Sequence, residues 1–173
     1  MTNLAGTEHR MELVRELAGV RYFNDSIASS PSRVRAAFDT LRECGVLRDG
    51  GRLLLIAGGQ DKGVSFVELG REICGIVDIL ILTGLAGARI MESVRAAEEF
   101  GESGLVIVTC VDLAGCVKVV HEMASEGDVV LFSPGCASYD AFESYEERGR
   151  IFRGLIASLG EFEIAGQARN DVM

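Results

Sequence analysis

The chain is poor in several residue types whose absence narrows its class. It has no tryptophan, two prolines and two histidines among 173 residues, and nearly half of its residues are apolar. So much apolar sequence with so little proline excludes a disordered protein. Two histidines and five cysteines without a C-x-x-C pair predict no metal site. No apolar run is long enough to span a bilayer and the first residues lack the pattern of a signal peptide, so we expect no membrane partner.

Positive charge is also scarce. Seventeen basic residues stand against twenty-six acidic ones, and the net charge is −9. A broad surface for nucleic acid is therefore excluded as a partner site, although a local anion site remains compatible with this balance. The odd number of cysteines, most of them at apolar positions, is typical of buried thiols in a reducing compartment. We therefore expect a cytoplasmic protein, and the length predicts one domain with its own core.

Short apolar runs alternate with amphipathic segments along most of the chain. Two short runs near the start, separated by a glycine, predict a hairpin or an antiparallel edge strand. The later runs are apolar at successive positions, as expected of strands covered on both faces. We therefore predict a three-layer, Rossmann-like α/β domain, with a mostly parallel sheet and helices on both faces. The expected strands cover 11–14, 20–24, 52–57, 78–82, 105–109 and 128–132, and the expected helices 31–45, 66–73, 86–100, 113–125 and a segment after 142.

Polar and glycine-rich segments follow three of these strands, at 24–29, 58–63 and 133–142. If the strands are parallel, all three segments lie on one rim of the sheet, where ligands bind in α/β folds. Lys62 offers a mobile positive charge between glycines, and a simple solvated lysine is the alternative. Ser138 or Asp140 is either part of this site or the N-cap of the following helix.

Other polar residues receive no catalytic role. Gly84 and Gly87 are typical of a helix-packing turn, with a phosphate loop as the weaker interpretation. His121 falls in the middle of an amphipathic helix, where a surface position is expected. The charges around Arg148 and Arg150 predict ion pairs along a solvated helix face. No residue pattern predicts a protein nucleophile or an ATP-binding P-loop, G-x-x-x-x-G-K-[ST].

Four motifs together resemble one family in order and spacing. They read H-R-M-E at 9–12, N-D-S-x-A-S at 24–29, G-G-x-D-K-G at 58–63 and S-P-x-x-A-S-x-D-x-F at 133–142, the last followed by R-G-x-x-F at 148–152. This pattern is similar to the carboxy-terminal domain of the Mur ligases, and the long last motif is most similar to the branch that adds D-glutamate. The resemblance implies a linker remnant at 1–8, the domain itself at 9–160 and a flexible tail at 161–173.

The resemblance also implies a reaction and its partners. Family members use ATP and Mg²⁺ to activate the carboxylate of UDP-N-acetylmuramoyl-L-alanine as an acyl phosphate, which the amine of D-glutamate attacks. They thereby serve peptidoglycan synthesis, cell shape and cell division. An amino-terminal and a central domain, absent from this sequence, would hold the UDP-sugar, the ATP and its metal ion. The chain alone is therefore expected to be inactive and to bind no cofactor tightly.

Six residues receive binding roles from the resemblance, and none is assigned as catalytic. The expected D-glutamate contacts are Lys62, Ser138, Ser29 and Tyr145, and the expected nucleotide contacts are Arg10 toward the phosphates and Asp25 toward the ribose. Three positions depart from the family pattern. Ser29 stands where threonine is common and Tyr145 where phenylalanine is common, and these changes keep the hydroxyl and the ring. Ile27 stands where lysine is common and cannot bind a carboxylate. An alternative function is therefore a non-enzymatic module that binds a nucleotide or a small anion.

Overall fold

The structure is a computed structural model that describes residues 6–47 and 50–160. The expected tail at 161–173 and most of the expected linker at 1–8 lie outside these residues. Within them, twelve helices and strands form three layers, and the predicted α/β class is confirmed. None of the described helices is both long and apolar enough to cross a bilayer.

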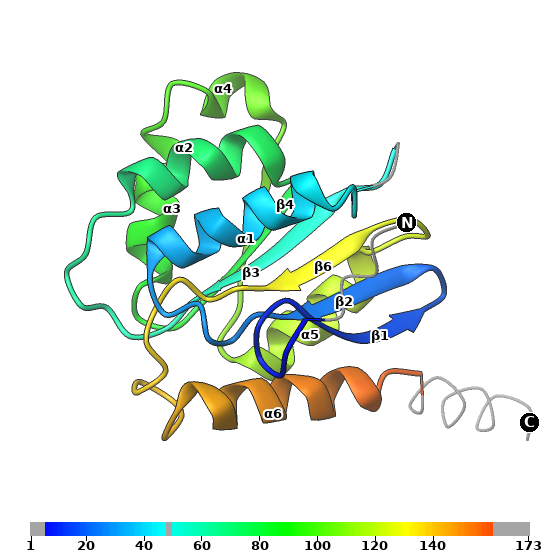
Figure 1. Cartoon of the computed structure of the whole chain (residues 1–173). Helices are drawn as coiled ribbons and strands as arrows, with labels where there is room; N and C mark the ends of the chain where they lie inside the picture. The colour runs from blue at the N-terminus through cyan, green and yellow to red at the C-terminus, as the bar shows by residue number, and fades with distance from the viewer. Residues whose placement is uncertain (1–5, 48–49, 161–173) are drawn as a thin grey trace, which may run out of the picture.

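A six-stranded sheet with one antiparallel edge forms the central layer (Figure 1). Its spatial order is β1-β2-β6-β3-β4-β5. The first two strands form the predicted hairpin, and every other neighbouring pair is parallel. The strands are β1 (Glu12–Leu17), β2 (Val20–Asn24), β3 (Leu53–Gly58), β4 (Ile79–Thr83), β5 (Val106–Thr109) and β6 (Val129–Phe132).

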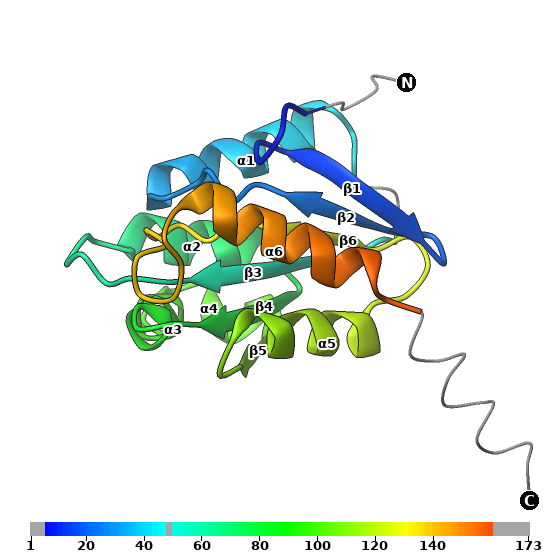
Figure 2. The same ribbon diagram turned by 90° about the horizontal axis from the view of Figure 1, so that it is seen from below.

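The helices cover both faces of the sheet, as Figure 2 shows from below. Alternate strand residues point to opposite faces, so each face has its own apolar core. Leu55 and Leu131 pack with α1, α2 and α3, whereas Ile56 and Phe132 pack with α5 and α6. The helices are α1 (Pro31–Glu43), α2 (Val67–Ile76), α3 (Gly87–Arg95), α4 (Phe100–Ser103), α5 (Leu113–Met123) and α6 (Tyr145–Ala157).

One predicted helix is two helices in the structure. The sequence predicts a single helix over 86–100, but α3 ends at Arg95 and α4 begins at Phe100. Between them, Ala97 donates its N–H to the Val94 carbonyl and Phe100 donates to Ala97, so the chain turns tightly through bonds of three-residue spacing. The turn lets Ala97 and Phe100 pack against the core, a tertiary gain that helical periodicity does not reveal.

Candidate functional site

The three polar segments meet at the carboxyl ends of β2, β6 and β3, which are neighbours in the sheet. Backbone hydrogen bonds join the segments directly. Gly58 donates its N–H to the Pro134 carbonyl at 2.8 Å, and Gly135 donates to Ala28 at the same distance. A third bond, of 2.9 Å, runs from the Gln60 N–H to the Ala137 carbonyl. The prediction that the segments share one rim is therefore confirmed.

Lys62 stands exposed on the loop that follows β3. Its ammonium lies 5.7 Å from the centre of the Tyr139 ring, which belongs to the segment after β6. Arg89 of α3 holds this loop by two contacts, because its guanidinium bonds the Asp61 carboxylate and donates to the Val64 carbonyl at 2.9 Å. A bond from the Gly63 N–H and the bond from Arg89 both lower the pKa of Asp61. The backbone carrying Lys62 is therefore fixed, while its ammonium forms no ion pair with a carboxylate of residues 6–47 and 50–160 and can meet a ligand.

The other expected D-glutamate contacts come from two segments and the first turn of α6. Ser29 is exposed, Tyr145 is half-buried and Ser138 is buried. Ser26 connects these segments, because its hydroxyl donates to the Tyr145 carbonyl at 2.8 Å. The structure thus brings Lys62, Ser29, Ser138 and Tyr145 to one end of the sheet, with Ser138 beneath the surface.

The alternative role of Ser138 or Asp140 as a helix cap is wrong. The N-cap of α6 is Ser144, whose hydroxyl accepts the Glu147 N–H at 3.1 Å. The Ser138 carbonyl instead accepts the N–H of Phe142 at 2.9 Å within a turn that precedes the helix. Ser and Asp are both ordinary N-cap residues, so the sequence favours Ser138, Asp140 and Ser144 equally as the N-cap of α6. The turn before the helix determines that Ser144 takes this position.

Arg148 is the residue that the sequence interpretation missed. It is buried rather than paired on a solvated face, with 2% of its surface exposed. Its guanidinium donates to the Ser26 hydroxyl and carbonyl at 3.1 and 2.7 Å, and to the Cys136 carbonyl at 2.9 Å. Burial lowers its pKa to about 10, so it stays charged at neutral pH. Its spacing from the core residues Phe152 and Ile156, four and eight positions on, was the available signal.

Gly84 lies in the turn before α3 and packs against the loop after β3. It has φ of 72°, and an added Cβ would lie 2.8 Å from backbone atoms of Gly59. Ala86, just before α3, donates its N–H to the Gly59 carbonyl at 2.9 Å. The turn therefore brings the loops after β3 and β4 into close contact.

A cavity of about 340 Å³ lies between α1, the segment before β1 and the segment after β2. Arg10 and Asp25, the two expected nucleotide contacts, both line it, together with Ile27, Ala28 and Arg33. In the described residues, no group of three or more His, Cys, Asp or Glu side chains is placed to hold a metal ion. The cavity is thus a site whose charges come from arginine and one carboxylate.

Asp25 is buried at the inner wall of this cavity. One carboxylate oxygen accepts from the Ser133 hydroxyl at 2.7 Å and the other from the Met11 N–H at 3.2 Å. Burial raises its pKa to about 6, although these bonds and the charges of Arg10 and Arg33 oppose that change. Asp25 therefore joins the segments around β1, β2 and β6, in addition to facing the cavity.

This raised pKa predicts a pH-dependent stability. Between about pH 4 and 6 the folded chain keeps a proton on Asp25 that the unfolded chain releases. The free energy of unfolding should thus fall as pH rises through this window, by on the order of 3 kcal/mol from this group, and stay level above it. Urea unfolding at several pH values checks this, with Asp25→Asn as the control that lacks the titration. Parallel pH profiles of the two proteins would contradict the assignment.

The comparisons with known proteins agree with this arrangement. Residues 9–136 match the family model described as Mur ligase, glutamate ligase domain. The chain is 40% identical over 160 residues to UDP-N-acetylmuramoylalanine–D-glutamate ligase of Acetivibrio thermocellus, covering 91% of this chain and 33% of that protein. It is 41% identical to the ligase of the same name from Symbiobacterium thermophilum, covering 92% and 32%. The chain thus spans about a third of the length of these relatives.

Solved structures show the same fold at lower identity. UDP-N-acetylmuramate–alanine ligase of Thermotoga maritima matches with a TM-score of 0.59 at 18% identity, over 88% of this chain and 31% of that one. Folylpolyglutamate synthase of Mycobacterium tuberculosis, complexed with ADP, matches with a TM-score of 0.59 at 15% identity, over 85% and 32%. From the family model, which covers most of its length, the chain belongs to the Mur ligase family and contains its glutamate ligase domain.

Proposed function

We propose that this chain is the amino-acid-binding domain of a cytoplasmic, ATP-dependent ligase that adds D-glutamate to UDP-N-acetylmuramoyl-L-alanine in peptidoglycan precursor synthesis. In the complete enzyme it would close over a site whose UDP-sugar, ATP and Mg²⁺ are held mainly by two other domains. The chain alone would be inactive, because its sequence contains no P-loop. Two relatives support this proposal, because both are named UDP-N-acetylmuramoylalanine–D-glutamate ligase.

The observation that carries the proposal is the position of Lys62. Its ammonium lies exposed on a fixed loop, beside the segment that holds Ser138 and across the rim from Ser29. A small dicarboxylate is well matched by one ammonium together with hydroxyl and backbone donors, since charge-assisted hydrogen bonds are the stronger ones. Tyr145 would complete this pocket at the start of α6.

The amide-forming step requires the protein to position the substrates, and it requires no nucleophile from the protein. The D-glutamate amine attacks an acyl phosphate that ATP has already activated, so the protein must orient the amine and neutralise phosphate charge. Arg10, whose cavity lies beside the same rim, is suited to the phosphates, and Asp25 to the ribose. The chain's own contribution is therefore to hold D-glutamate and to close one side of the nucleotide site.

The test begins with the gene that encodes this chain. We expect its full product to include a P-loop upstream of residue 1 and to release phosphate from ATP only when both UDP-N-acetylmuramoyl-L-alanine and D-glutamate are supplied. L-glutamate and D-aspartate serve as matched controls that should not support the reaction. A gene product without the P-loop, or without D-glutamate dependence, would overturn the proposal and favour the non-enzymatic anion-binding module.

A further inference from the structure

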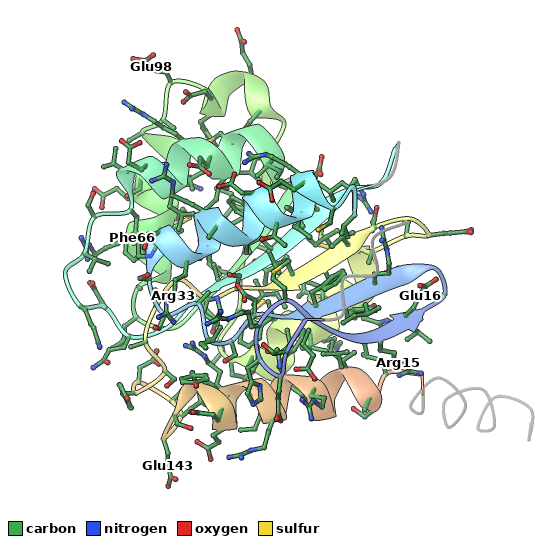
Figure 3. The ribbon with its side chains drawn as sticks, viewed as in Figure 1. Arg15, Glu16, Arg33, Phe66, Glu98 and Glu143 are labelled. Carbon is green, nitrogen blue, oxygen red and sulfur yellow. The ribbon has the colours of Figure 1, made fainter. Side chains whose placement is uncertain are left out.

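Arg33 lines the same cavity as Arg10 and Asp25 but has no role in the function proposed above. It is the third residue of α1, at the end of the sheet where the strand-end segments gather, as Figure 3 shows. One guanidinium nitrogen donates to the Ile27 carbonyl at 2.8 Å, and the side chain is exposed. Among the described residues this bond holds the guanidinium at the cavity wall and leaves most of its five N–H donors available.

The pairing of the other α1 arginines makes Arg33 stand out. Arg35 bonds Glu72 of α2, and Arg42 bonds Asp39 one turn earlier at 3.0 Å. Within residues 6–47 and 50–160, no carboxylate forms an ion pair with Arg33, and none does with Arg10. Of the three arginines of α1, Arg33 is thus the one that forms no ion pair with a described carboxylate, and it lines the cavity.

The charge inside the cavity is therefore positive, in a chain whose net charge is −9. Asp25 is the acid among the lining residues, and both of its oxygens already accept hydrogen bonds from Met11 and Ser133. Arg10 and Arg33 line this cavity and form no ion pair with a carboxylate of the described residues, so both can meet an anion, since guanidinium matches carboxylate and phosphate oxygens bidentately.

The position of Arg33 also relates the two expected ligand sites. Its hydrogen-bond acceptor, Ile27, lies midway between Asp25 and Ser29, the expected ribose and D-glutamate contacts. Arg33 and Arg10 both act electrostatically on Tyr145, another expected D-glutamate contact. An anionic group that lies between the expected nucleotide and D-glutamate sites would therefore contact the Arg33 guanidinium, whereas the Ile27 side chain carries no charge to bind it.

We propose that Arg33 is a binding residue whose guanidinium holds an anionic oxygen group of a substrate in this cavity, either a carboxylate of D-glutamate or a phosphate of ATP. The choice of these two ligands rests on the function proposed above, whereas the anion site itself rests on the cavity and its unpaired arginines.

The first test uses the chain by itself, with two probe anions. Calorimetric titration with sodium tripolyphosphate and with D-glutamate is expected to show binding of at least one of them. The binding should be about tenfold weaker in Arg33→Gln, which loses a charge-assisted hydrogen bond to the anion. Arg42→Gln removes the same charge from the same helix outside the cavity, and should bind like the unchanged chain. Equal affinities in Arg33→Gln and the unchanged chain, or no binding of either anion, would overturn the proposal.

The second test uses the full product of the gene and decides which group Arg33 holds. A roughly tenfold rise in the KM for D-glutamate in Arg33→Gln, with an unchanged KM for ATP, assigns the carboxylate, and the reverse assigns a phosphate. Because Ile27 lines the same cavity, adding Ile27→Lys to Arg33→Gln should recover most of the lost affinity. If both KM values stay unchanged, Arg33 holds no substrate. If the unchanged enzyme makes no product, the proposed ligase function fails, and the calorimetry still decides the anion site.

Discussion

Replacing Arg148 by alanine is expected to lower the free energy of unfolding by about 3–5 kcal/mol, a large share of the stability of one domain. The substitution removes three charge-assisted hydrogen bonds at once. It also leaves the carbonyls of Ser26 and Cys136 without these donors inside the protein, and an unsatisfied buried polar group costs roughly 1–3 kcal/mol. Urea unfolding followed by circular dichroism measures the loss.

The neighbouring arginine gives a matched control. Arg150 is exposed on the same helix, so Arg150→Ala should change the stability by no more than about 0.5 kcal/mol. Arg148→Lys keeps the charge but loses the planar fork that reaches Ser26 and Cys136 together, so an intermediate loss is expected. If Arg148→Ala were as stable as Arg150→Ala, the buried bonds around Arg148 would contribute nothing to the fold.

Arg148 also shows why the site depends on the fold. It bonds the segment after β2 through Ser26 and the segment after β6 through Cys136, and the Ser26 hydroxyl in turn bonds Tyr145. The same side chain therefore fixes the distance between the segment that carries Ser29 and the one that carries Ser138. Weakening it would loosen the expected D-glutamate pocket before the domain unfolds.

Local patterns in the sequence predicted the layers of this fold well, for a physical reason. Strands such as β3 and β4 are apolar at nearly every position because helices cover both of their faces, and few other arrangements of a short strand produce this pattern. The hairpin was also predictable, since Gly19, in the turn between β1 and β2, separates two short runs of strand-forming residues. The break between α3 and α4 was not predictable, because it depends on the core residues that Phe100 contacts in the folded chain.

The candidate site shows the same division between local and tertiary information. The gathering of the three segments followed from parallel strands, whereas the burial of Arg148 depends on contacts with the distant Ser26 segment, and the cap of α6 depends on the turn that precedes the helix. An arginine flanked by two glutamates and another arginine has the composition of a solvated helix face. Only its spacing from Phe152 and Ile156 places Arg148 on the buried face of α6. The charged neighbours predict the exposed face, and no local pattern decides between these two predictions. Arg33 is similar, because only the folded structure reveals that no carboxylate of the described residues forms an ion pair with it.

In the full product of the gene, Lys62→Ala is expected to raise the KM for D-glutamate by roughly 10- to 150-fold, because a hydrogen bond to a charged group contributes about 1.5–3 kcal/mol. The KM for ATP should change little, since Arg10 and Asp25 line a cavity to which Lys62 does not contribute. Steady-state assays with D-glutamate varied at saturating ATP, and with ATP varied at saturating D-glutamate, measure both effects. The free energy of unfolding should be nearly unaffected, because Lys62 is exposed and its contact with the Tyr139 ring, at 5.7 Å from the ring centre, lies on the surface.

The control for Lys62 is Lys118, an exposed lysine on α5 whose ammonium lies 3.9 Å from a Glu122 carboxylate oxygen. Lys118→Ala removes the same charge from a different part of the surface and should leave the KM for D-glutamate unchanged, as surface ion pairs contribute little. Lys62→Arg retains a positive charge on the same fixed loop, so it should recover part of the affinity if charge is what D-glutamate meets there. An unchanged KM in Lys62→Ala would instead identify Lys62 as a solvated surface lysine. The dicarboxylate would then depend on Arg33 and the backbone donors of the rim for its charge neutralisation.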